Sequence, residues 1–242
     1  MAQRYAETSQ WQYDRAMALL ALCPPAAGDA VLDIGCGTGG VTFEIARRVG
    51  AGASIFAIDP DADRLAVARA SAPSDAALRF IETIAERLDD VPDAAVDYVY
   101  SSYVFHWVAD KPRALAEALR CMRSGARMAV EAVGVPGKPQ IDLCEIAGPG
   151  GQRRIKRFLC PTEGEWRALL ESAGFVIEHF AWPELPFDFP SFEVFLSWWE
   201  GTTHGDVVRE NIAPEALEAM RSQYPERVQY TAPSIQFVVR KP

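Results

Sequence analysis

Three glycines at alternate positions, with one aspartate just before them and a second one further along the chain, form the part of this sequence best suited to bind a nucleoside. They lie in VLDIGCGTG at 31–39, where glycine allows a sharp turn and lets the backbone approach a ligand. These glycines are Gly35, Gly37 and Gly39. Asp33 stands two residues before the first of them, and Asp59 follows a second apolar stretch. A carboxylate at the position of Asp59 is suited to accept hydrogen bonds from both hydroxyls of a ribose.

Two kinds of cofactor fit this turn. Gly35, Gly37 and Gly40 also satisfy the dinucleotide fingerprint G-x-G-x-x-G, which is typical of nicotinamide and flavin sites. Asp33 favours a ligand without phosphate, because a carboxylate beside the turn would repel a pyrophosphate. S-adenosylmethionine instead presents an α-ammonium, which an acid helps to hold directly or through water. A turn of this shape with no ligand is the remaining alternative, and the agreement of strand, turn, helix and Asp59 argues against it.

An alternation of strands and helices must position these residues. The stretch 31–34 predicts a buried strand, and Val41, Ile45 and Val49 line one face of the helix after the turn. Further helices are predicted at 8–22, 62–70, 112–122 and 163–173, and further strands at 54–58, 78–81, 96–101, 128–132, 175–180 and 235–240. Alternating strands and helices imply an α/β fold with a Rossmann-like, doubly wound parallel sheet.

Two segments, 134–162 and 184–231, fall outside this alternation. We expect both to lie over the carboxyl ends of the strands, where ligands bind in such folds, and to form a small cap that contacts the substrate. The whole chain, 1–242, is predicted to be a single domain.

The glycine motif resembles the signature of class I S-adenosylmethionine-dependent methyltransferases, and the resemblance covers most of the chain. AIDPD, around Asp59, resembles the ribose-binding acidic loop of that family. VDYVYSSYVFHWV at 96–108 resembles its fourth strand and the segment after it, and RSGARMAVEA at 123–132 resembles its fifth strand. The resemblance implies a seven-stranded, mostly parallel sheet with an antiparallel last strand. It also implies S-adenosylmethionine as the methyl donor and S-adenosylhomocysteine as the product.

The resemblance assigns cofactor contacts residue by residue. These are Asp33, Gly35, Cys36, Gly37 and Gly39 at the methionine end, Asp59 and Pro60 at the ribose, Ile84, Ala85 and Glu86 at the adenine, Ser101 at the ammonium through its carbonyl, and Tyr5 and Gln12 from an N-terminal helical lid at 1–30.

The adenine loop departs from the family pattern. The family often has Gly-Asp-Ala-Glu after the third strand, where the aspartate accepts a hydrogen bond from the adenine amino group. Here Ile84 takes the place of that aspartate and offers no side-chain acceptor. Either Glu86 or Glu82 replaces it, or backbone and apolar contacts alone hold the adenine.

His106, Trp107 and Tyr103 follow the fourth strand, facing the expected site of methyl transfer. His106 is a candidate general base, a hydrogen-bond donor to a substrate carboxylate, or a structural histidine. Trp107 and Tyr103 are expected to form the pocket wall.

The FHWV run and the later SFEVFLSWWEGTTHG most resemble methyltransferases that act on small-molecule carboxylates, among them trans-aconitate, juvenile hormone acid and malonyl-carrier-protein O-methyltransferases. Trp198 and Trp199 in the second stretch are either the wall of an apolar acceptor pocket or the core of a cap helix.

A basic run, GQRRIKRF at 151–158, stands out in an otherwise acidic chain. Arg154 and Arg157 in this run are candidate contacts for an anionic acceptor or an acidic carrier protein. The alternative is a solvated surface run, since exposed charges are normal.

Composition restricts the remaining function classes. A net charge of −9 argues against nucleic-acid binding, which needs a basic face. No apolar run reaches transmembrane length, and the first residues lack the apolar region of a signal peptide. Five cysteines without regular spacing suit a reducing cytoplasm, and the three histidines form no metal-ligand pattern, so no metal is expected.

The sequence therefore predicts methyl transfer from S-adenosylmethionine to a small molecule, with a carboxylate oxygen as the first choice of acceptor. Methylation of a hydroxyl, nitrogen or carbon with His106 as base is the alternative. Two alternatives come from other function classes: a nicotinamide-dependent oxidoreductase and a non-catalytic cofactor-binding protein.

Overall fold

The computed structural model describes residues 10–74, 77–157, 161–203 and 206–242 and divides the chain into two compact units. The larger unit contains Trp11–Ala132, Pro161–Trp182 and Ile235–Pro242. The smaller unit contains Gln10 and the described parts of 133–160 and 183–234. Tyr5, which was predicted to contact the cofactor, lies outside the described residues.

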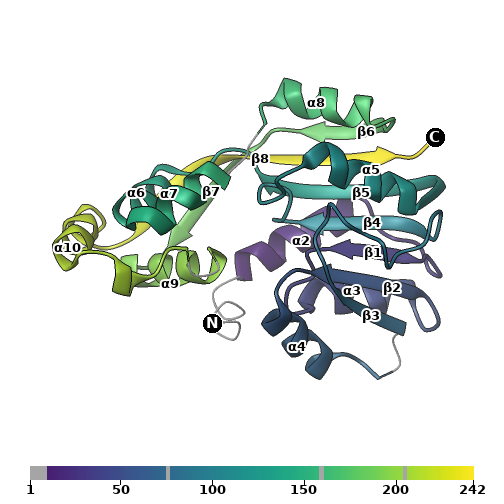
Figure 1. Cartoon of the computed structure of the whole chain (residues 1–242), viewed down its shortest axis with the longest axis horizontal. Coiled ribbons are helices and arrows are strands. Elements are labelled where there is room, and N and C mark those ends of the chain that lie inside the picture. The colour runs from purple at the N-terminus through teal and green to yellow at the C-terminus, as the bar shows by residue number, and fades with distance from the viewer. Residues whose placement is uncertain (1–9, 75–76, 158–160, 204–205) are drawn as a thin grey trace. The chain divides into compact units, whose positions relative to one another are not determined.

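The larger unit alternates strands and helices around one sheet (Figure 1). Its elements are α2 (Gln10–Leu22), β1 (Val31–Ile34), α3 (Gly40–Val49), β2 (Ser54–Asp59), α4 (Ala62–Ser71), β3 (Ala77–Glu82), β4 (Val96–Ser102), α5 (Lys111–Cys121), β5 (Met122–Val133), α8 (Glu163–Ser172), β6 (Val176–Ala181) and the second part of β8 (Val228–Arg240). All seven predicted strands are present, most within one or two residues of the predicted bounds.

The strand order is β3-β2-β1-β4-β5-β8-β6. Strand β1 pairs in parallel with β2 and β4, and the pairs β2–β3 and β4–β5 are also parallel. Strand β8 pairs antiparallel with β6. The predicted Rossmann-like sheet with an antiparallel last strand is confirmed. Because β1 is central, the glycine turn at its end lies where the strand order reverses, which is where such sheets bind ligands.

Strand β5 begins six residues earlier than predicted. Met122 pairs with Val96, the register then shifts, and pairing resumes between Arg127 and Tyr98. Gly125, inside the shifted stretch, has a φ of +82°, a conformation that glycine adopts without steric cost. The polar residues around it gave no apolar alternation, so the pattern did not predict this irregular start of the strand.

Capping side chains fix where the helices begin. Asp61 accepts hydrogen bonds from the backbone N–H groups of Asp63 and Arg64 at the start of α4. Thr162 and Glu165 form a capping box at the start of α8. Each cap satisfies backbone donors that the first helical turn leaves without intrahelical partners, so these helices begin close to where the sequence predicts.

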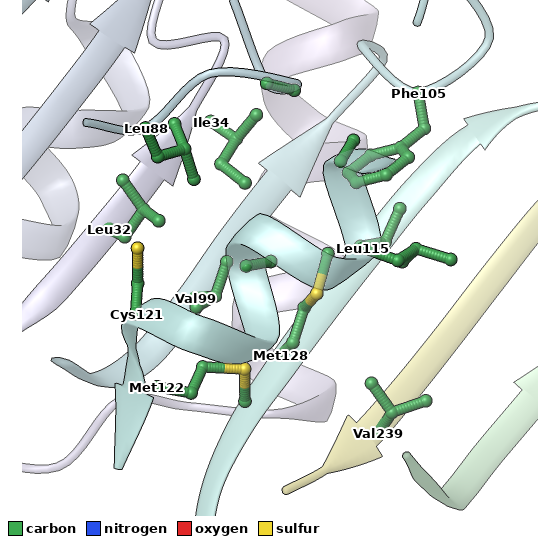
Figure 2. Close-up of a cluster of buried hydrophobic side chains, with 14 of the residues drawn as sticks. Leu32, Ile34, Leu88, Val99, Phe105, Leu115, Cys121, Met122, Met128 and Val239 are labelled. Carbon is green, nitrogen blue, oxygen red and sulfur yellow. The ribbon is translucent and has the colours of Figure 1, made fainter. Parts of the chain in front are cut away.

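A hydrophobic core fills one face of the sheet. Figure 2 shows its side chains from β1, β4, β5, β8 and α5. Its labelled members are Leu32, Ile34, Leu88, Val99, Phe105, Leu115, Cys121, Met122, Met128 and Val239. A second core covers the opposite face and includes Leu19 and Leu20 of α2 and Ile45 of α3. Alternate residues of β1 therefore serve both cores, which is why this strand reads as a nearly continuous apolar run.

Two tyrosines hold α2 to the sheet. The Tyr98 hydroxyl donates to the carbonyl of Cys23 at 2.7 Å, and the Tyr100 hydroxyl donates to the carbonyl of Ala16 at 3.1 Å. Both hydroxyls are buried, so these bonds satisfy polar groups that water does not reach. They fix the position of the helix from which Gln12 and Arg15 project.

The smaller unit combines helices with a two-stranded pairing. Its elements are α6 (Lys138–Ile146), α7 (Gly148–Arg157), β7 (Glu184–Phe189), α9 (Phe192–Thr202), the short 3₁₀ helix η1 (Arg209–Asn211), α10 (Pro214–Gln223) and the first part of β8. Strand β7 pairs antiparallel with residues 228–233 of β8. Aromatic side chains of β7 and α9 pack together, with Phe189 and Trp198 ring centroids 5.0 Å apart. In the described part of the chain, no helix is both long and apolar enough to cross a membrane.

Candidate functional site

The glycine turn after β1 is bonded to the end of the neighbouring strand β2. The backbone N–H groups of Gly35 and Cys36 both donate to the carbonyl of Ile58, at 2.8 and 2.9 Å. Gly35, Gly37 and Gly39 have φ angles of +82°, +55° and +89°, a region that side-chain-bearing residues rarely adopt. The turn therefore requires glycine at each of the three predicted positions.

The three glycines differ in what surrounds them. A Cβ added to Gly35 would lie 2.0 Å from the side chain of Val104, and one added to Gly39 would lie 2.5 Å from the ring of Phe43. A Cβ added to Gly37 would meet nothing within 4 Å. Gly35 and Gly39 are thus required for packing, whereas Gly37 borders open space, as a backbone that a ligand approaches must do. The turn fits the phosphate-free nucleoside cofactor predicted from the sequence.

Asp59 joins the end of β2 to the glycine turn. Its Oδ2 accepts from the backbone N–H of Gly37 at 2.9 Å, and its Oδ1 accepts from that of Asp61 at 2.9 Å. A carboxylate oxygen can accept more than one hydrogen bond, so both oxygens retain capacity for ribose hydroxyls. The neighbouring Pro60 is exposed. Asp59 lies at the strand end where the predicted ribose acid belongs.

Asp33 is a buried carboxyl of β1, two residues before the first glycine of the turn. Its side chain is 2 % exposed, and Thr42 Oγ1 of α3 donates to its Oδ2 at 2.6 Å. Burial raises the pKa of Asp33 from 3.8 to about 7, the Thr42 bond opposes the rise, and the charge of Asp59 adds to it. A cation nearby would favour the ionised form. Thr42 was missed by the sequence analysis, although it lies three residues into the helix after the turn.

Ser101 connects the ends of two central strands. Its side chain is fully buried, and its Oγ donates to the carbonyl of Ile34 at 2.9 Å. This bond holds the ends of β4 and β1 together beside the glycine turn. The predicted role of the Ser101 carbonyl toward a methionine ammonium stays a prediction.

The segment after β3 supplies an apolar surface where the family has an acid. Ile84 is 45 % exposed, whereas Ala85 is buried. Glu86 Oε1 accepts from the backbone N–H groups of Ala109 and Asp110, at 3.0 and 3.2 Å. One oxygen of Glu86 therefore supports the start of α5, and the predicted role of Glu86 toward the adenine stays a prediction.

The aromatic residues after β4 pack closely against one another. His106 is buried, its ring centroid lies 4.5 Å from that of Trp107, and the ring of Tyr103 lies 6.4 Å from that of His106. Tyr103 has a φ of +59°, which is uncommon for a residue with a side chain and marks a strained backbone. The three predicted residues therefore form one cluster, and the chemical role of His106 stays a prediction.

A buried ion pair beside this cluster was missed by the sequence analysis. Glu131 of β5 is fully buried, and its Oε1 accepts from Nε and Nη2 of Arg15 at 2.8 and 2.5 Å. The Tyr103 hydroxyl lies 3.4 Å from the same oxygen. Burial raises the pKa of Glu131, although Arg15 opposes the rise. The sequence signal that could have indicated this buried acid is the glutamate inside the apolar run MAVEAV at a strand end.

Gln12, the remaining predicted cofactor residue on α2, has a buried amide oxygen. This Oε1 forms no hydrogen bond with any described residue. A buried acceptor of this kind is costly, so it marks a position where a donor from a ligand would be favourable.

The candidate acceptor residues lie in the smaller unit and are largely buried. Arg154 is 5 % exposed, and its Nη2 donates to the carbonyl of Thr203 and lies 3.1 Å from Asp206 Oδ2. It is therefore not part of a solvated run. Trp198 and Trp199 are 2 % and 1 % exposed within α9, as expected for the core of a cap helix. The side chain of Arg157 lies outside the described residues.

Among the described residues, no group of three or more histidine, cysteine, aspartate or glutamate side chains is arranged to hold a metal ion.

Comparison with known proteins agrees with this geometry. Residues 32–130, which contain the glycine turn, Asp59 and the strand ends β1 to β5, match the family model described as a methyltransferase domain. A malonyl-[acyl-carrier protein] O-methyltransferase of Pectobacterium atrosepticum is 39 % identical over 126 residues, which is 52 % of this chain and 46 % of that protein. The chloroplastic 2-phytyl-1,4-beta-naphthoquinone methyltransferase of Arabidopsis thaliana is 33 % identical over 107 residues, 43 % of this chain and 41 % of that protein.

The chain spans less than half the length of these curated relatives. Among solved structures, the YcgJ protein of Bacillus subtilis superposes with a TM-score of 0.68 at 18 % identity and covers 95 % of this chain and 98 % of its own. That likeness concerns the fold alone. The predicted resemblance to methyltransferases is confirmed for residues 32–130 by the family match.

Proposed function

We propose that this chain, whose residues 32–130 match a methyltransferase domain, uses S-adenosylmethionine to transfer a methyl group to a carboxylate oxygen of a small molecule. The observation that carries the cofactor assignment is the burial of Asp33, at 2 % exposure, two residues before the first glycine of the turn. A negative charge so close in the chain repels a pyrophosphate on the turn, whereas it attracts an ammonium. The buried acid thus supports a phosphate-free cofactor.

Each part of the site has a distinct task in binding. Asp33 attracts the α-ammonium of the methionine moiety, and Asp59 accepts the ribose hydroxyls through the free capacity of its two oxygens. The open space at Gly37 lets the backbone approach the ligand. Ile84 offers apolar surface to the adenine.

The reaction needs positioning more than acid–base chemistry. S-adenosylmethionine supplies an electrophilic methyl group and a neutral thioether leaving group. The protein must hold the acceptor oxygen in line with the bond that breaks and exclude water, and such positioning contributes roughly 7–11 kcal/mol. A carboxylate with a pKa near 4 is already ionised, so it needs no base. In this proposal the buried cluster of Tyr103, His106 and Trp107 forms the wall, and His106 orients the acceptor as a hydrogen-bond donor.

We propose that segments 134–162 and 184–231 act as the substrate cap. The malonyl-[acyl-carrier protein] O-methyltransferase relative supports a carboxylate that a carrier protein can present. A reducing cytoplasm fits the four described cysteines, which are all buried and free.

A second candidate is methylation of a hydroxyl, nitrogen or carbon with His106 as general base. The naphthoquinone methyltransferase relative favours it, because that name places the acceptor on a ring system. The buried position of His106 beside Trp107 is compatible with this role as well.

Two measurements test the proposal in sequence. Calorimetry should detect binding of S-adenosylhomocysteine and none of NADH, and the reverse result would overturn the cofactor assignment. Incubation with methyl-labelled donor and a panel of carboxylic acids, phenols and amines should then label a carboxylic acid. Base-labile label identifies a methyl ester, whereas base-stable label on a phenol or amine would support the second candidate.

A further inference from the structure

One edge of the Arg15 guanidinium is fixed by a buried carboxylate. Nε and Nη2 form this edge and donate to Glu131 Oε1 at 2.8 and 2.5 Å. The Glu131 side chain is fully buried in β5, so water does not compete with Arg15 for its carboxylate. The plane and direction of the guanidinium are therefore set by the sheet, although Arg15 itself lies on α2.

Within the described residues, the bonds to Glu131 leave other donors of the Arg15 guanidinium for a ligand. A guanidinium has five N–H donors, and two edges on which it can bind a carboxylate with two parallel hydrogen bonds. Glu131 uses one edge, and the outer edge, formed by Nη1 and Nη2, retains donors. The Arg15 side chain is 31 % exposed, so the residue is reachable from solvent despite its buried partner.

Tyr103 is held against the same group. Its backbone N–H donates to the Glu131 carbonyl at 2.7 Å, and its hydroxyl lies 3.4 Å from Glu131 Oε1. The hydroxyl also interacts with Arg15. The strained φ of Tyr103, +59°, is thereby stabilised from both ends of the residue. Strain retained in this way is typical of ligand sites.

The location agrees with a ligand site. Glu131 pairs with Ser102, the last residue of β4, at the carboxyl ends of two parallel strands. Ser101, bonded to the end of β1, is the preceding residue, and His106 packs beside Tyr103. Arg15 therefore stands at the edge of the sheet where the methyl-transfer site is assigned.

We propose that Arg15 binds a carboxylate of the reacting molecules, and that Glu131 and Tyr103 are the residues that position Arg15 for it. The proposal rests on the proposed function, because it needs a carboxylate at this edge. Two reacting molecules carry one: the methionine moiety of the cofactor and the acceptor. The same guanidinium chemistry serves either source, and the two are separated by experiment.

The first experiment measures binding of S-adenosylhomocysteine and of its decarboxylated analogue to the wild-type protein and to Arg15→Gln. Removing Arg15 alone leaves Glu131 buried without its cation, so Arg15→Gln is compared with the double variant Arg15→Gln/Glu131→Gln, which restores a neutral pair. Arg123→Gln is the control, because Arg123 forms an exposed ion pair with Asp97 at the opposite end of β5. If the carboxylate belongs to the cofactor, both Arg15 variants bind S-adenosylhomocysteine about 10- to 100-fold more weakly and its decarboxylated analogue as the wild type does.

The second experiment uses the acceptor. Labelling of a panel of mono-, di- and tricarboxylic acids is measured with saturating methyl donor. If Arg15 holds the acceptor, binding of S-adenosylhomocysteine is unchanged in both variants, while the KM for the labelled acid rises about 10- to 100-fold and Arg15→Lys restores part of it. Unchanged affinity for S-adenosylhomocysteine together with unchanged KM in the folded double variant would overturn the inference. Failure of the wild-type protein to bind S-adenosylhomocysteine at all would instead overturn the proposed function.

Discussion

The carboxylate of Asp59 accepts a hydrogen bond from the backbone N–H of Gly37, at 2.9 Å, across the 22 residues that separate them. This bond links the acid assigned to the ribose with the one glycine of the turn that borders open space. The two parts of the predicted cofactor site are therefore one structural unit, so changes at either residue should affect both.

Replacing Asp59 should weaken cofactor binding while the fold persists. Asp59→Ala removes the acceptor for the ribose hydroxyls and the support of Gly37, and charge-assisted hydrogen bonds are the strong ones. We expect a loss of about 2–4 kcal/mol in the binding free energy of S-adenosylhomocysteine, measured by calorimetry. Asp63→Asn, on the exposed side of α4, should bind as the wild type does. Equal affinity in folded Asp59→Ala would mean that another acid holds the ribose.

Asp33 should make folding stability depend on pH. Its pKa is raised from 3.8 to about 7, so between these values the folded protein binds more protons at this site than the unfolded chain. The contribution of Asp33 is therefore fully present below about pH 4, is lost as the pH rises toward 7, and is constant above. Asp33→Asn removes this dependence while it keeps an acceptor for Thr42.

The measurement is urea unfolding of both proteins from pH 4 to pH 8. The stability of the wild type relative to Asp33→Asn should fall by a few kcal/mol between pH 4 and 7 and then level off. A constant difference across that range would show that Asp33 is ionised throughout, and the burial argument would fail.

Gly37 should be required both for ligand binding and for its backbone conformation, whereas Gly28 should be required only for its backbone conformation. Both have positive φ angles, +55° and +87°, and a Cβ on either meets nothing within 4 Å. Alanine at each position should cost about 1–2 kcal/mol of stability, because the left-handed region is unfavourable for it. Only Gly37→Ala should abolish binding of S-adenosylhomocysteine in a thermal-shift titration. Normal binding by Gly37→Ala would place the ligand elsewhere.

His106→Gln should distinguish the two acceptor classes. For a carboxylate acceptor, which needs no base, the variant keeps a hydrogen-bond donor and should retain activity within about tenfold, or 1.4 kcal/mol. For a phenol or alcohol, loss of a base should cost roughly 10²–10⁴-fold and remove the fall in rate below about pH 6.5. The rate is to be measured across pH once an acceptor is known. A loss beyond a thousandfold with the acid limb abolished would defeat the carboxylate proposal.

Arg154 should matter for stability where its neighbour Arg153 does not. Arg154 is buried against Asp206 and the Thr203 carbonyl, whereas the Arg153 side chain is 60 % exposed. Arg154→Gln should lower the free energy of unfolding by about 1–3 kcal/mol, because it removes a charged donor from a buried site. Arg153→Gln should change it by less than about 0.5 kcal/mol. Chemical denaturation of the two variants measures this difference. Equal free energies of unfolding would mean that Arg154, like Arg153, is a solvated surface residue.

The sequence predicted the parts of the site that are close together in the chain. VLDIGCGTG holds its strand, turn and helix start within a few residues, so local pattern and glycine geometry were sufficient. The Arg15–Glu131 pair joins residues 116 positions apart, and no local pattern relates them. Arg154 was predicted to be a candidate acceptor contact, with a solvated surface run as the alternative, and its burial was not foreseen because its partners, Thr203 and Asp206, are likewise remote in the chain.

The same distinction applies to the fold. Strands with short apolar runs, such as β1 and β4, were predicted within a residue or two of their observed bounds. Strand β7 was missed because ELPFDF contains a proline and two acids, although its alternate apolar residues are buried. The beginning of β8 at Val228 was missed because its first part, VQYTAPS, contains a proline and several polar residues, and its partner strand was not foreseen.

The position of β8 in the sheet affects how the chain folds while it is being synthesised. Its residues 228–233 complete the pairing with β7, and its later residues lie between β5 and β6. Every other described strand emerges earlier, so β5 must wait with an unpaired edge until β8 is synthesised. Such an edge is a template for association with other chains. The nascent polypeptide is thus exposed to aggregation at this edge until β8 has been synthesised, and a chaperone that shields strand edges would act during that interval.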